Sequence, residues 1–362
     1  MPRLRIAVIA PANSIHTIRW VNGLSAYADI DLFSLADHPN KSEMIDPSVR
    51  LTYLPSRGKL GYLLAARALR RLAKGFAVYN VHYASGYGTL ARLAGIKPYV
   101  LNFWGTDIFE FPNKSPIHRR LIQGNAKHAA HVVSTSEVMK QEILKICPGL
   151  SVSVVPFGVD LSRFDYQSHQ ITEGRLRLGT CKILSPPYAI DDMIKAVSLL
   201  KQLLKDSQLE LSLSIYGDGP SRSELADLIH QLELDEIVTL HGWISHDSIP
   251  DVLQRMDIFL LSSLQESFGV SAIEAQAAGV PVIATATAGF QEVIQNGRTG
   301  RIVAVADPPA MAQAILDLVK DPASYQRYRL AGRESVEVHY DWDKNVKQQY
   351  ELLERVAQAN KV

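Results

Sequence analysis

Short apolar runs alternate with amphipathic segments along nearly the whole chain. Each apolar run predicts a buried strand, and the amphipathic stretch after it predicts a helix. In the first half, the predicted strands cover residues 6–10, 29–35, 78–82, 99–102, 131–134 and 151–155. In the second half, they cover residues 176–181, 210–216, 238–241, 257–262, 280–285 and 301–303. Because strands and helices alternate, we expect parallel sheets flanked by helices.

The chain is long enough for two domains. Its 362 residues exceed the size, about 250–300 residues, at which one hydrophobic core usually stops growing. With 47% hydrophobic residues, both domains can bury a core. We therefore expect an α/β fold of two doubly wound domains, residues 1–165 and 166–340, followed by an amphipathic helix in residues 341–362. The polar stretch 165–174 is the expected linker.

Two glutamates mark the loop and helix that follow the predicted strand 257–262. Glu266 lies in the loop, and Glu274 lies about one turn into the next helix, roughly 6 Å along its axis from Val270. Ligands of parallel sheets bind beyond the carboxyl ends of the strands, at helix N-termini. This spacing suits a phosphate at the amides of residues 268–270 and a ribose hydroxyl at Glu274. The alternative is a pair of solvated surface carboxylates.

The residues around these glutamates resemble the retaining nucleotide-sugar glycosyltransferases of family 4. The resemblance is carried by Glu266-Ser267-Phe268-Gly269, Glu274-Ala275 and the segments 277–285, 288–294 and 296–300. It implies the GT-B fold, in which two Rossmann-like domains face a cleft. It also implies that the first domain receives the acceptor, that the second binds the donor, and that the last helix crosses back to the first.

The resemblance also assigns roles to individual residues. Glu266 would face the donor sugar and act in catalysis, and Glu274 would bind the nucleotide ribose. The amides of Phe268, Gly269 and Val270 would hold phosphate. On the behaviour of this family, amides and basic side chains meet the phosphate charge, so we expect no metal ion and no cofactor; the nucleotide-sugar is a substrate.

Lys182 follows the predicted strand 176–181, where the family has a basic residue that neutralises the donor diphosphate. The family's second basic residue lies five positions later, and this chain has Pro187 there. A proline supplies no positive charge to the departing diphosphate. Either Lys182 and helix-terminal amides suffice, or Arg222 substitutes, or catalysis is weak.

A glycine-rich turn follows the predicted strand 210–216. Gly217 and Gly219 permit a close backbone approach to a ligand, and the resemblance places this turn beside the nucleotide. The alternative is an ordinary strand-to-helix turn. Trp243 follows the next strand and would either line the site of the nucleotide base or pack in the core.

Three residues of the first half are candidate site residues. His16 lies at the first loop-to-helix junction, where amides could meet the diphosphate or the acceptor; alternatively, it caps the helix or packs locally. Many family members have a histidine at the position of Trp104, and that histidine contacts the donor sugar. In this chain the contact could be made by His82, by Asp107 or by backbone groups. Asp107 could instead be a loop-stabilising carboxylate. No Gly-x-Gly-x-x-Gly follows the first strand, which disfavours a dinucleotide oxidoreductase.

The net charge of +1 hides an asymmetry between the halves. Residues 1–165 carry 20 Lys and Arg against 11 Asp and Glu, whereas residues 166–362 carry 18 against 26. Different partners are therefore expected for the two halves. Nucleic acid is not an expected partner.

Four basic residues recur at helical spacing on a predicted helix over residues 60–72 and just beyond it. They are Arg67, Arg70, Arg71 and Lys74. They form one stripe on the helix surface, which is either a solvated face, a docking site for an anionic membrane or a contact for the pyrophosphate of an acceptor. Family members that build cell-surface polysaccharides use lipid-diphosphate acceptors at the inner leaflet.

The N-terminal sequence and the two cysteines indicate a reduced compartment. The N-terminal apolar run is too short for a signal peptide, and no apolar stretch approaches 18 residues. Cys147 and Cys181 are expected to be ordinary buried thiols. The expected location is the cytoplasm, with association at the inner face of the plasma membrane.

The expected function is that of a metal-independent, retaining glycosyltransferase in cell-surface polysaccharide synthesis. It would move a sugar from a nucleotide-sugar, with UDP as the expected carrier, to a glycan or polyprenyl-diphosphate-linked acceptor. The alternative is a catalytically weak homologue that binds nucleotide and acts as a partner in a polysaccharide-assembly complex. A GT-B enzyme without glycosyl transfer, such as an epimerase, is disfavoured by the setting of Glu266 and Glu274.

Overall fold

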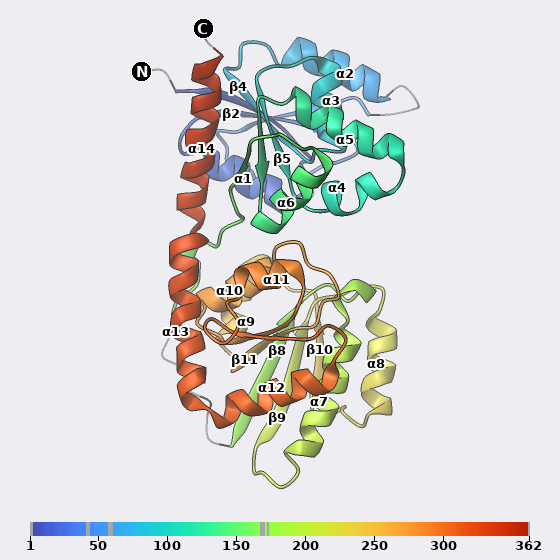
Figure 1. The fold of residues 1–362 in the computed structure, drawn as a ribbon, viewed down its shortest axis with the longest axis vertical. Coiled ribbons are helices and arrows are strands. Elements are labelled where there is room, and N and C mark those ends of the chain that lie inside the picture. Colours follow the sequence, from blue (N-terminus) through green and yellow to red (C-terminus); the bar gives the residue numbers. More distant parts are fainter. Residues whose placement is uncertain (1–2, 41–43, 57–60, 167–170, 172–173, 361–362) are drawn as a thin grey trace. The chain divides into compact units, whose positions relative to one another are not determined.

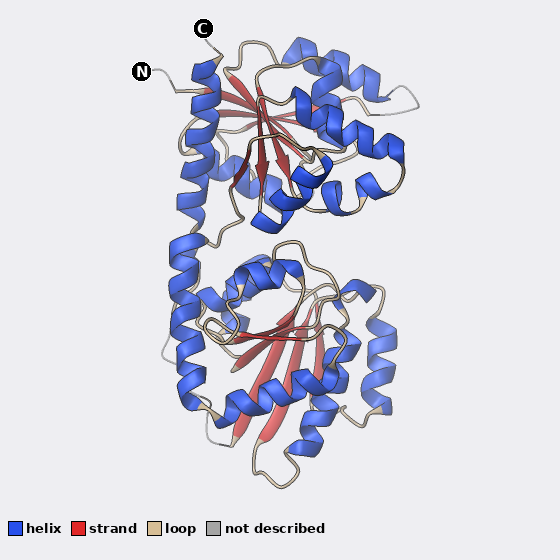
Figure 2. Cartoon of the chain, viewed as in Figure 1, coloured by secondary structure: helices blue, strands red, loops and turns tan. Residues whose placement is uncertain are grey.

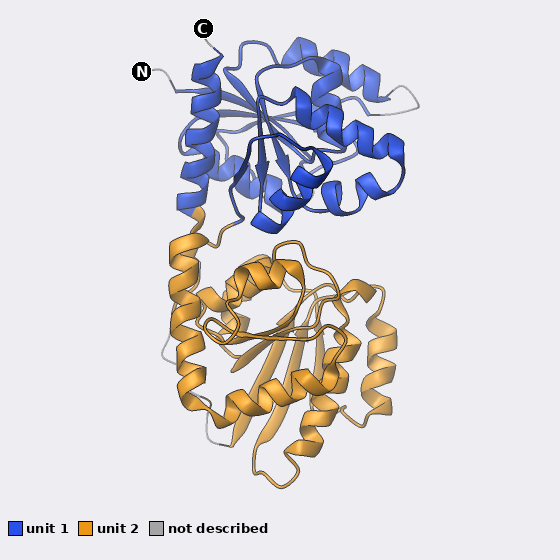
Figure 3. Cartoon of the chain, in the orientation of Figure 1, with its two compact units in different colours: residues 1–157, 343–362 blue, residues 158–342 orange. Residues whose placement is uncertain are grey.

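The computed structural model describes residues 3–40, 44–56, 61–166, 171 and 174–360. The chain divides into two compact units, residues 1–157 with 343–362 and residues 158–342 (Figure 3). The predicted boundary after Asp165 falls inside the second unit. Within the predicted linker, residues 167–170 and 172–173 lie outside the described part of the chain.

The first unit is built on a seven-stranded parallel sheet of order β3-β2-β1-β4-β5-β6-β7. Its strands are β1 (Arg5–Ile9), β2 (Asp29–Leu35), β3 (Arg50–Leu54), β4 (Val78–His82), β5 (Tyr99–Phe103), β6 (His131–Ser134) and β7 (Val152–Val154). Its helices include α1 (Ile15–Ser25), α2 (Gly61–Leu72), α3 (Gly86–Ala94), α4 (Thr106–Phe109), α5 (Pro116–His128) and α6 (Glu137–Ile146). The helices flank the sheet (Figure 2).

The second unit is built on a six-stranded parallel sheet of order β10-β9-β8-β11-β12-β13. Its strands are β8 (Arg175–Cys181), β9 (Glu210–Tyr216), β10 (Val238–Gly242), β11 (Ile258–Leu261), β12 (Val282–Thr285) and β13 (Arg301–Val303). Its helices include α7 (Ile190–Leu203), α8 (Arg222–Gln231), α9 (Ile249–Leu253), α10 (Val270–Ala277), α11 (Ala288–Val293), α12 (Pro308–Lys320) and α13 (Pro322–His339) (Figure 1).

The predicted fold class, two doubly wound Rossmann-like domains, is confirmed by these sheets. One strand, β3, was not predicted from the sequence. This strand lies at the edge of its sheet, and four of its five residues are half-buried or exposed, so it has no apolar run. The predicted helix over residues 60–72 is α2; Leu60 lies outside the described residues.

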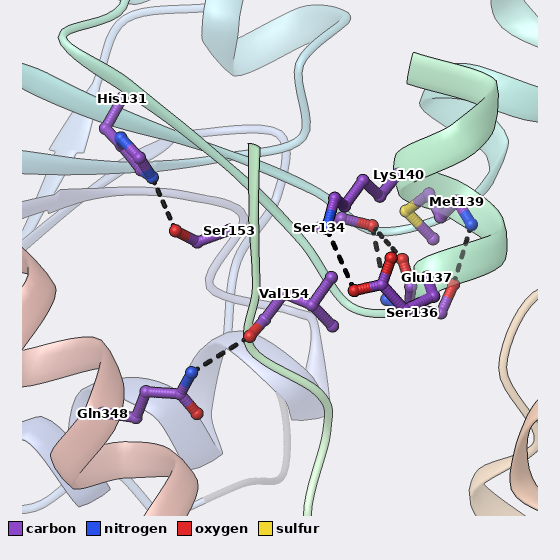
Figure 4. A network of polar contacts seen from close by, with 9 residues as sticks. All are labelled: His131, Ser134, Ser136, Glu137, Met139, Lys140, Ser153, Val154 and Gln348. Atoms are coloured by element: carbon purple, nitrogen blue, oxygen red, sulfur yellow. Dashed lines mark hydrogen bonds and ion pairs between the residues drawn. The ribbon is translucent and has the colours of Figure 1, made fainter. Parts of the chain in front are cut away.

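Side chains on and after β6 and β7 fix the start of a helix and the edge strand of the first sheet (Figure 4). The Ser136 hydroxyl caps α6 by accepting a hydrogen bond from the Met139 amide at 3.0 Å. His131 Nε2 lies 2.8 Å from the Ser153 hydroxyl and joins β6 to β7. Gln348 donates to the Val154 carbonyl at 3.1 Å, which attaches the last helix, α14 (Trp342–Ala359), to β7.

A buried polar layer also attaches α14 to the sheet of the first unit. Gln349 Nε2 lies 3.2 Å from the side-chain oxygens of both Asn80 and Asn102. The Asn102 amide donates to Asn80 Oδ1 at 2.6 Å. All three side chains are at most 5% exposed, so burial removes their hydrogen bonds to water. The hydrogen bonds among the three side chains replace those to water. Among the described residues, no helix is long and apolar enough to span a bilayer.

Replacing Gln349 with alanine should destabilise the first unit. The Asn102 oxygen would lose its Gln349 donor in a buried setting, which typically costs about 1–3 kcal/mol. Gln348→Ala is the matched control, because this neighbour is exposed and donates its hydrogen bond to the edge strand rather than to the buried layer. Urea unfolding followed by fluorescence should show a lower midpoint for Gln349→Ala and a much smaller change for the control. Equal midpoints for the two variants would contradict this account of the polar layer.

Candidate functional site

In the second unit, two glycines hold the ends of β8, β9 and β10 together. Gly217 has a φ of +141°, and a Cβ at this position would overlap the carbonyl oxygen of Lys182. Its amide donates to the Gly242 carbonyl at 2.8 Å, and the Lys182 amide donates to the Tyr216 carbonyl at 2.9 Å. A Cβ at Gly219 would overlap the carbonyl of Leu184. The glycine-rich turn therefore lies directly against the segment that carries Lys182.

Lys182 and Glu266, two predicted catalytic residues, form an ion pair. Lys182 Nζ lies 2.5 Å from Glu266 Oε2, and the two side chains are only 15% and 16% exposed. The ammonium group also lies 4.5 Å from the centre of the Tyr188 ring, within cation–π range. Burial makes this pairing necessary, because an unpaired charge loses much of its hydration there.

The segment after Lys182 departs from the expected pattern in a defined way. Pro187 is exposed, and its carbonyl accepts a hydrogen bond from the Leu264 amide at 2.8 Å. Ala189, which directly precedes α7, has a φ of +45°, in the left-handed region that favours glycine. Arg222 donates through Nη2 to the Leu240 carbonyl at 3.1 Å, while Nη1 is buried with no hydrogen-bond partner among the described residues.

The loop that carries Glu266 is held by a second close backbone contact. The Gly289 amide donates to the Glu266 carbonyl at 2.9 Å, and a Cβ at Gly289 would overlap the Phe268 amide. Gly269, with a φ of +98°, precedes α10, whose first turn begins at Val270. Amides in the first turn of a helix have no acceptor within it, so they can bind an anion.

Glu274 is nearly buried and already accepts one hydrogen bond. Its side chain is 7% exposed, and Oε1 lies 3.0 Å from His246 Nε2. His246 Nδ1 lies 3.2 Å from Arg163 Nη1. Desolvation, with a further contribution from Glu274, raises the pKa of Cys181 to about 12, so this thiol stays protonated. His246 and Arg163 were not predicted from the sequence, because they lie in short 3-10 helices that neither periodicity nor a glycine pattern marks.

In the first unit, the rings of His82 and His16 both lie near that of Trp104. The His82 ring is 1% exposed, and its centre lies 4.3 Å from that of Trp104. Burial, and then the nearby His16, lowers the pKa of His82 to about 3, so its imidazole is neutral at ordinary pH. The His16 ring stacks on Phe157 at 4.4 Å and meets Trp104 edge-on at 6.0 Å.

Asp107 lies under the same loops and is 1% exposed. Its carboxylate accepts hydrogen bonds from the amides of Ala84, at 2.9 Å, Gly105, at 3.0 Å, and Trp104, at 3.1 Å. Burial raises its pKa, and these amides act in the opposite direction. This arrangement favours the loop-stabilising alternative for Asp107.

The predicted site residues thus form one group in each unit. The group in the second unit comprises Lys182, Glu266, Phe268, Gly269, Val270, Glu274, Gly217 and Gly219. In the first unit, His16 and His82 meet around Trp104, and Asp107 orders the loops beside them. Trp243 is 75% exposed, so the alternative of core packing is wrong for it. In the described part of the chain, no cluster of three or more His, Cys, Asp or Glu side chains could hold a metal ion.

Two family models match the chain, one in each half. "Glycosyl transferases group 1" matches residues 163–335, and "Glycosyl transferase 4-like" matches residues 5–136. Glycogen synthase of Mycobacterium tuberculosis is 28% identical over 213 residues, 58% of this chain and 50% of that protein. N-acetyl-alpha-D-glucosaminyl L-malate synthase of Bacillus anthracis is 34% identical over 147 residues, 41% of this chain and 38% of that protein. The chain therefore spans about half the length, or less, of these curated relatives.

Solved structures share the fold over nearly the whole chain. Sucrose-phosphate synthase from Thermosynechococcus elongatus superposes with a TM-score of 0.82 at 20% identity, covering 99% of this chain and 100% of that one. HepE from Anabaena, solved in complex with UDP, gives a TM-score of 0.80 at 17% identity, covering 98% and 100%. The family models and the shared two-sheet architecture agree: the chain belongs to the glycosyltransferases of the family 4 type, with the GT-B fold.

Proposed function

We propose that this protein transfers a sugar from a UDP-sugar to a glycan or lipid-linked acceptor with retention of configuration. The observation that carries the proposal is the grouping of Lys182, the glycine-rich turn and the start of α10 at the carboxyl edge of one parallel sheet. A cation and helix-terminal amides at such an edge match the charge of a nucleoside diphosphate. UDP is the proposed carrier because HepE, a protein of the same fold, was solved with it.

Donor binding would exchange the partners of charges that are already paired. The diphosphate would take Lys182 from Glu266, and the first-turn amides of α10 would hold its other oxygens. Glu266 would then be available to accept hydrogen bonds from the sugar hydroxyls. Glu274 Oε2, which accepts no hydrogen bond from the described residues, would bind the ribose.

The proposed reaction is a displacement on the face that the leaving group occupies. The acceptor hydroxyl forms a bond to the anomeric carbon as the bond from that carbon to the diphosphate breaks. The departing phosphate oxygen takes the hydroxyl proton, so no separate general base is needed. Lys182 and the α10 amides would stabilise the negative charge that develops on the diphosphate.

The first unit would receive the acceptor. His82 is neutral and nearly inaccessible, so its proposed role is to support Trp104 and the adjoining loop. His16 is only half-buried and is the better placed of the two to contact a substrate. Asp107 would keep these loops in place through its three amide contacts.

Glu274→Ala should weaken UDP binding about tenfold or more. The lost hydrogen bond is to a charged acceptor, worth about 1.5–3 kcal/mol, and 1.4 kcal/mol corresponds to tenfold. Isothermal titration calorimetry with UDP measures the change. Glu224→Ala, in the first turn of α8, is the control and should bind as the wild type does. Unchanged UDP affinity in Glu274→Ala would remove Glu274 from the donor site.

Purified protein should release UDP from its donor sugar in the presence of an acceptor, and the product should keep the donor's anomeric configuration. Lys182→Met should reduce turnover about 10²–10³-fold, because one donor to the developing charge is lost. Lys195→Met removes an exposed lysine that pairs with Asp191 and Asp192, and should leave turnover unchanged. Coupled UDP detection and NMR of the product measure both properties.

A second function is favoured by Pro187, which supplies no charge to the diphosphate. In that case the protein binds nucleotide and acts as a partner in a polysaccharide-assembly complex. Wild-type protein that binds UDP but turns over no donor with any glycan or lipid-diphosphate acceptor would support this alternative and contradict glycosyl transfer.

We also propose that α2 docks on an anionic membrane. Arg67, Arg71 and Lys74 are exposed, and Leu63 and Leu64 beside them are 49% and 47% exposed. Basic and apolar side chains on one exposed helix fit the interface of an anionic leaflet. Arg70 differs, because it donates to the Ala94 carbonyl at 2.7 Å, at the end of α3, and so has a structural role.

Arg67→Glu with Arg71→Glu should reduce binding to phosphatidylglycerol vesicles at low salt. Each basic residue near an anionic leaflet contributes about 1 kcal/mol, and charge reversal adds repulsion. Vesicle co-sedimentation measures the bound fraction. The control is Arg119→Glu with Arg120→Glu, two exposed arginines of α5. Undiminished binding of the α2 variant would contradict membrane docking, and binding only to neutral vesicles that carry a polyprenyl diphosphate would assign the stripe to the acceptor.

A further inference from the structure

A chain of three side chains leads from the start of the second unit to Glu274. Arg163 belongs to a short 3-10 helix, Leu161–Arg163, and His246 begins another, His246–Ser248. Arg163 Nη1 lies 3.2 Å from His246 Nδ1, and His246 Nε2 lies 3.0 Å from Glu274 Oε1. These residues come from three segments that are far apart in sequence, so their alignment is a property of the fold.

The direction of each hydrogen bond follows from the chemistry of arginine. A guanidinium group donates and never accepts, so His246 Nδ1 must offer its lone pair to Arg163. In the neutral imidazole the proton then resides on Nε2, where it is donated to Glu274 Oε1. Arg163 thus selects the tautomer of His246 that can hold the carboxylate, as the outer partners of metal-bound histidines do.

Arg163 also fixes the backbone that carries His246. Its Nη2 donates to the His246 carbonyl at 3.2 Å and to Asp247 Oδ1 at 2.8 Å. Asp160 orders the turn that presents Arg163, because its side chain accepts a hydrogen bond from the Ser162 amide at 3.0 Å. The imidazole is therefore held both at its ring and at its main chain.

The result is a carboxylate with one oxygen engaged and one available. Glu274 Oε1 accepts from His246, whereas Oε2 accepts no hydrogen bond from the described residues. A glutamate has three rotatable side-chain bonds, and restricting them before the ligand arrives lowers the entropic cost of binding. A vicinal diol such as ribose would meet Oε2 in a fixed orientation.

We propose that Arg163 and His246 are positioning residues that orient Glu274 for recognition of the ribose hydroxyls of the donor. The inference rests on the proposed function, since it takes the ligand of Glu274 to be a nucleoside diphosphate. Neither residue need touch the nucleotide; both act through the carboxylate.

A ribose-specific measurement separates this role from general support of the loop. Calorimetry gives the affinities for UDP and for 2′,3′-dideoxy-UDP, and their ratio isolates the contribution of the hydroxyls. The wild type should prefer UDP by about tenfold or more, as expected for hydrogen bonds to a carboxylate. His246→Leu should lower this preference towards that of Glu274→Ala, and Arg163→Met should lower it partly.

Two further variants test the route of the effect. His246→Gln can place an N–H near the position of Nε2 and should restore most of the preference for UDP. His246→Leu in a Glu274→Ala background should cause no further loss of preference, because the two residues act through one carboxylate. The matched controls are His230→Leu, an exposed histidine of α8, and Arg175→Met, an exposed arginine of β8. Both controls should keep the wild-type ratio.

The outcomes distinguish this inference from the proposed function. Equal weakening of UDP and dideoxy-UDP in His246→Leu and Arg163→Met, with the wild-type ratio kept, would mean purely structural roles and overturn the inference. If Glu274→Ala keeps the ratio, or the wild type binds no UDP, the proposed donor site itself fails. Thermal unfolding without nucleotide shows whether each variant is folded. If His246→Leu is unfolded, the ratios of UDP to dideoxy-UDP affinity in Arg163→Met and His246→Gln test the inference.

Discussion

The close approach of backbone to backbone at Gly217 is the constraint on which the second unit's site depends. No side chain fits between Gly217 and the Lys182 carbonyl, so the ends of β8, β9 and β10 can be tied together only with glycine there. Gly289 does the same for the loop of Glu266. These two contacts bring Lys182 and Glu266, which are far apart in sequence, into an ion pair.

The charges of this site are paired before any donor arrives. An isolated buried charge is costly, so Lys182 is matched by Glu266, and Glu274 accepts a hydrogen bond from His246. In the proposed function, binding of a diphosphate would therefore exchange one partner of Lys182 for another. Tyr188, beside the ammonium group, gives a further favourable contact near the place where the family has its second basic residue.

The sequence predicted the sheets because their inner strands are continuous apolar runs, and it missed β3 because that edge strand is largely accessible. Topology alone places Lys182, Glu266 and the glycine-rich turn at one edge of a parallel sheet, so their grouping could be foreseen. The hydrogen-bonded chain of Arg163, His246 and Glu274 could not be foreseen, because it depends on how two short 3-10 helices are placed. The sequence also left two roles open for Asp107, since only the positions of the surrounding amides distinguish them.

The last helix has a chemical as well as a packing role in the first unit. Gln349 and Asn102 both donate to Asn80 Oδ1, which turns the Asn80 amide nitrogen towards His82 Nε2, 3.1 Å away. His82 must then carry its proton on Nδ1, which has no hydrogen-bond partner among the described residues. The tautomer of the neutral His82 beside Trp104 is thus set in part by α14. Residues of the last helix therefore support the candidate site of the first unit.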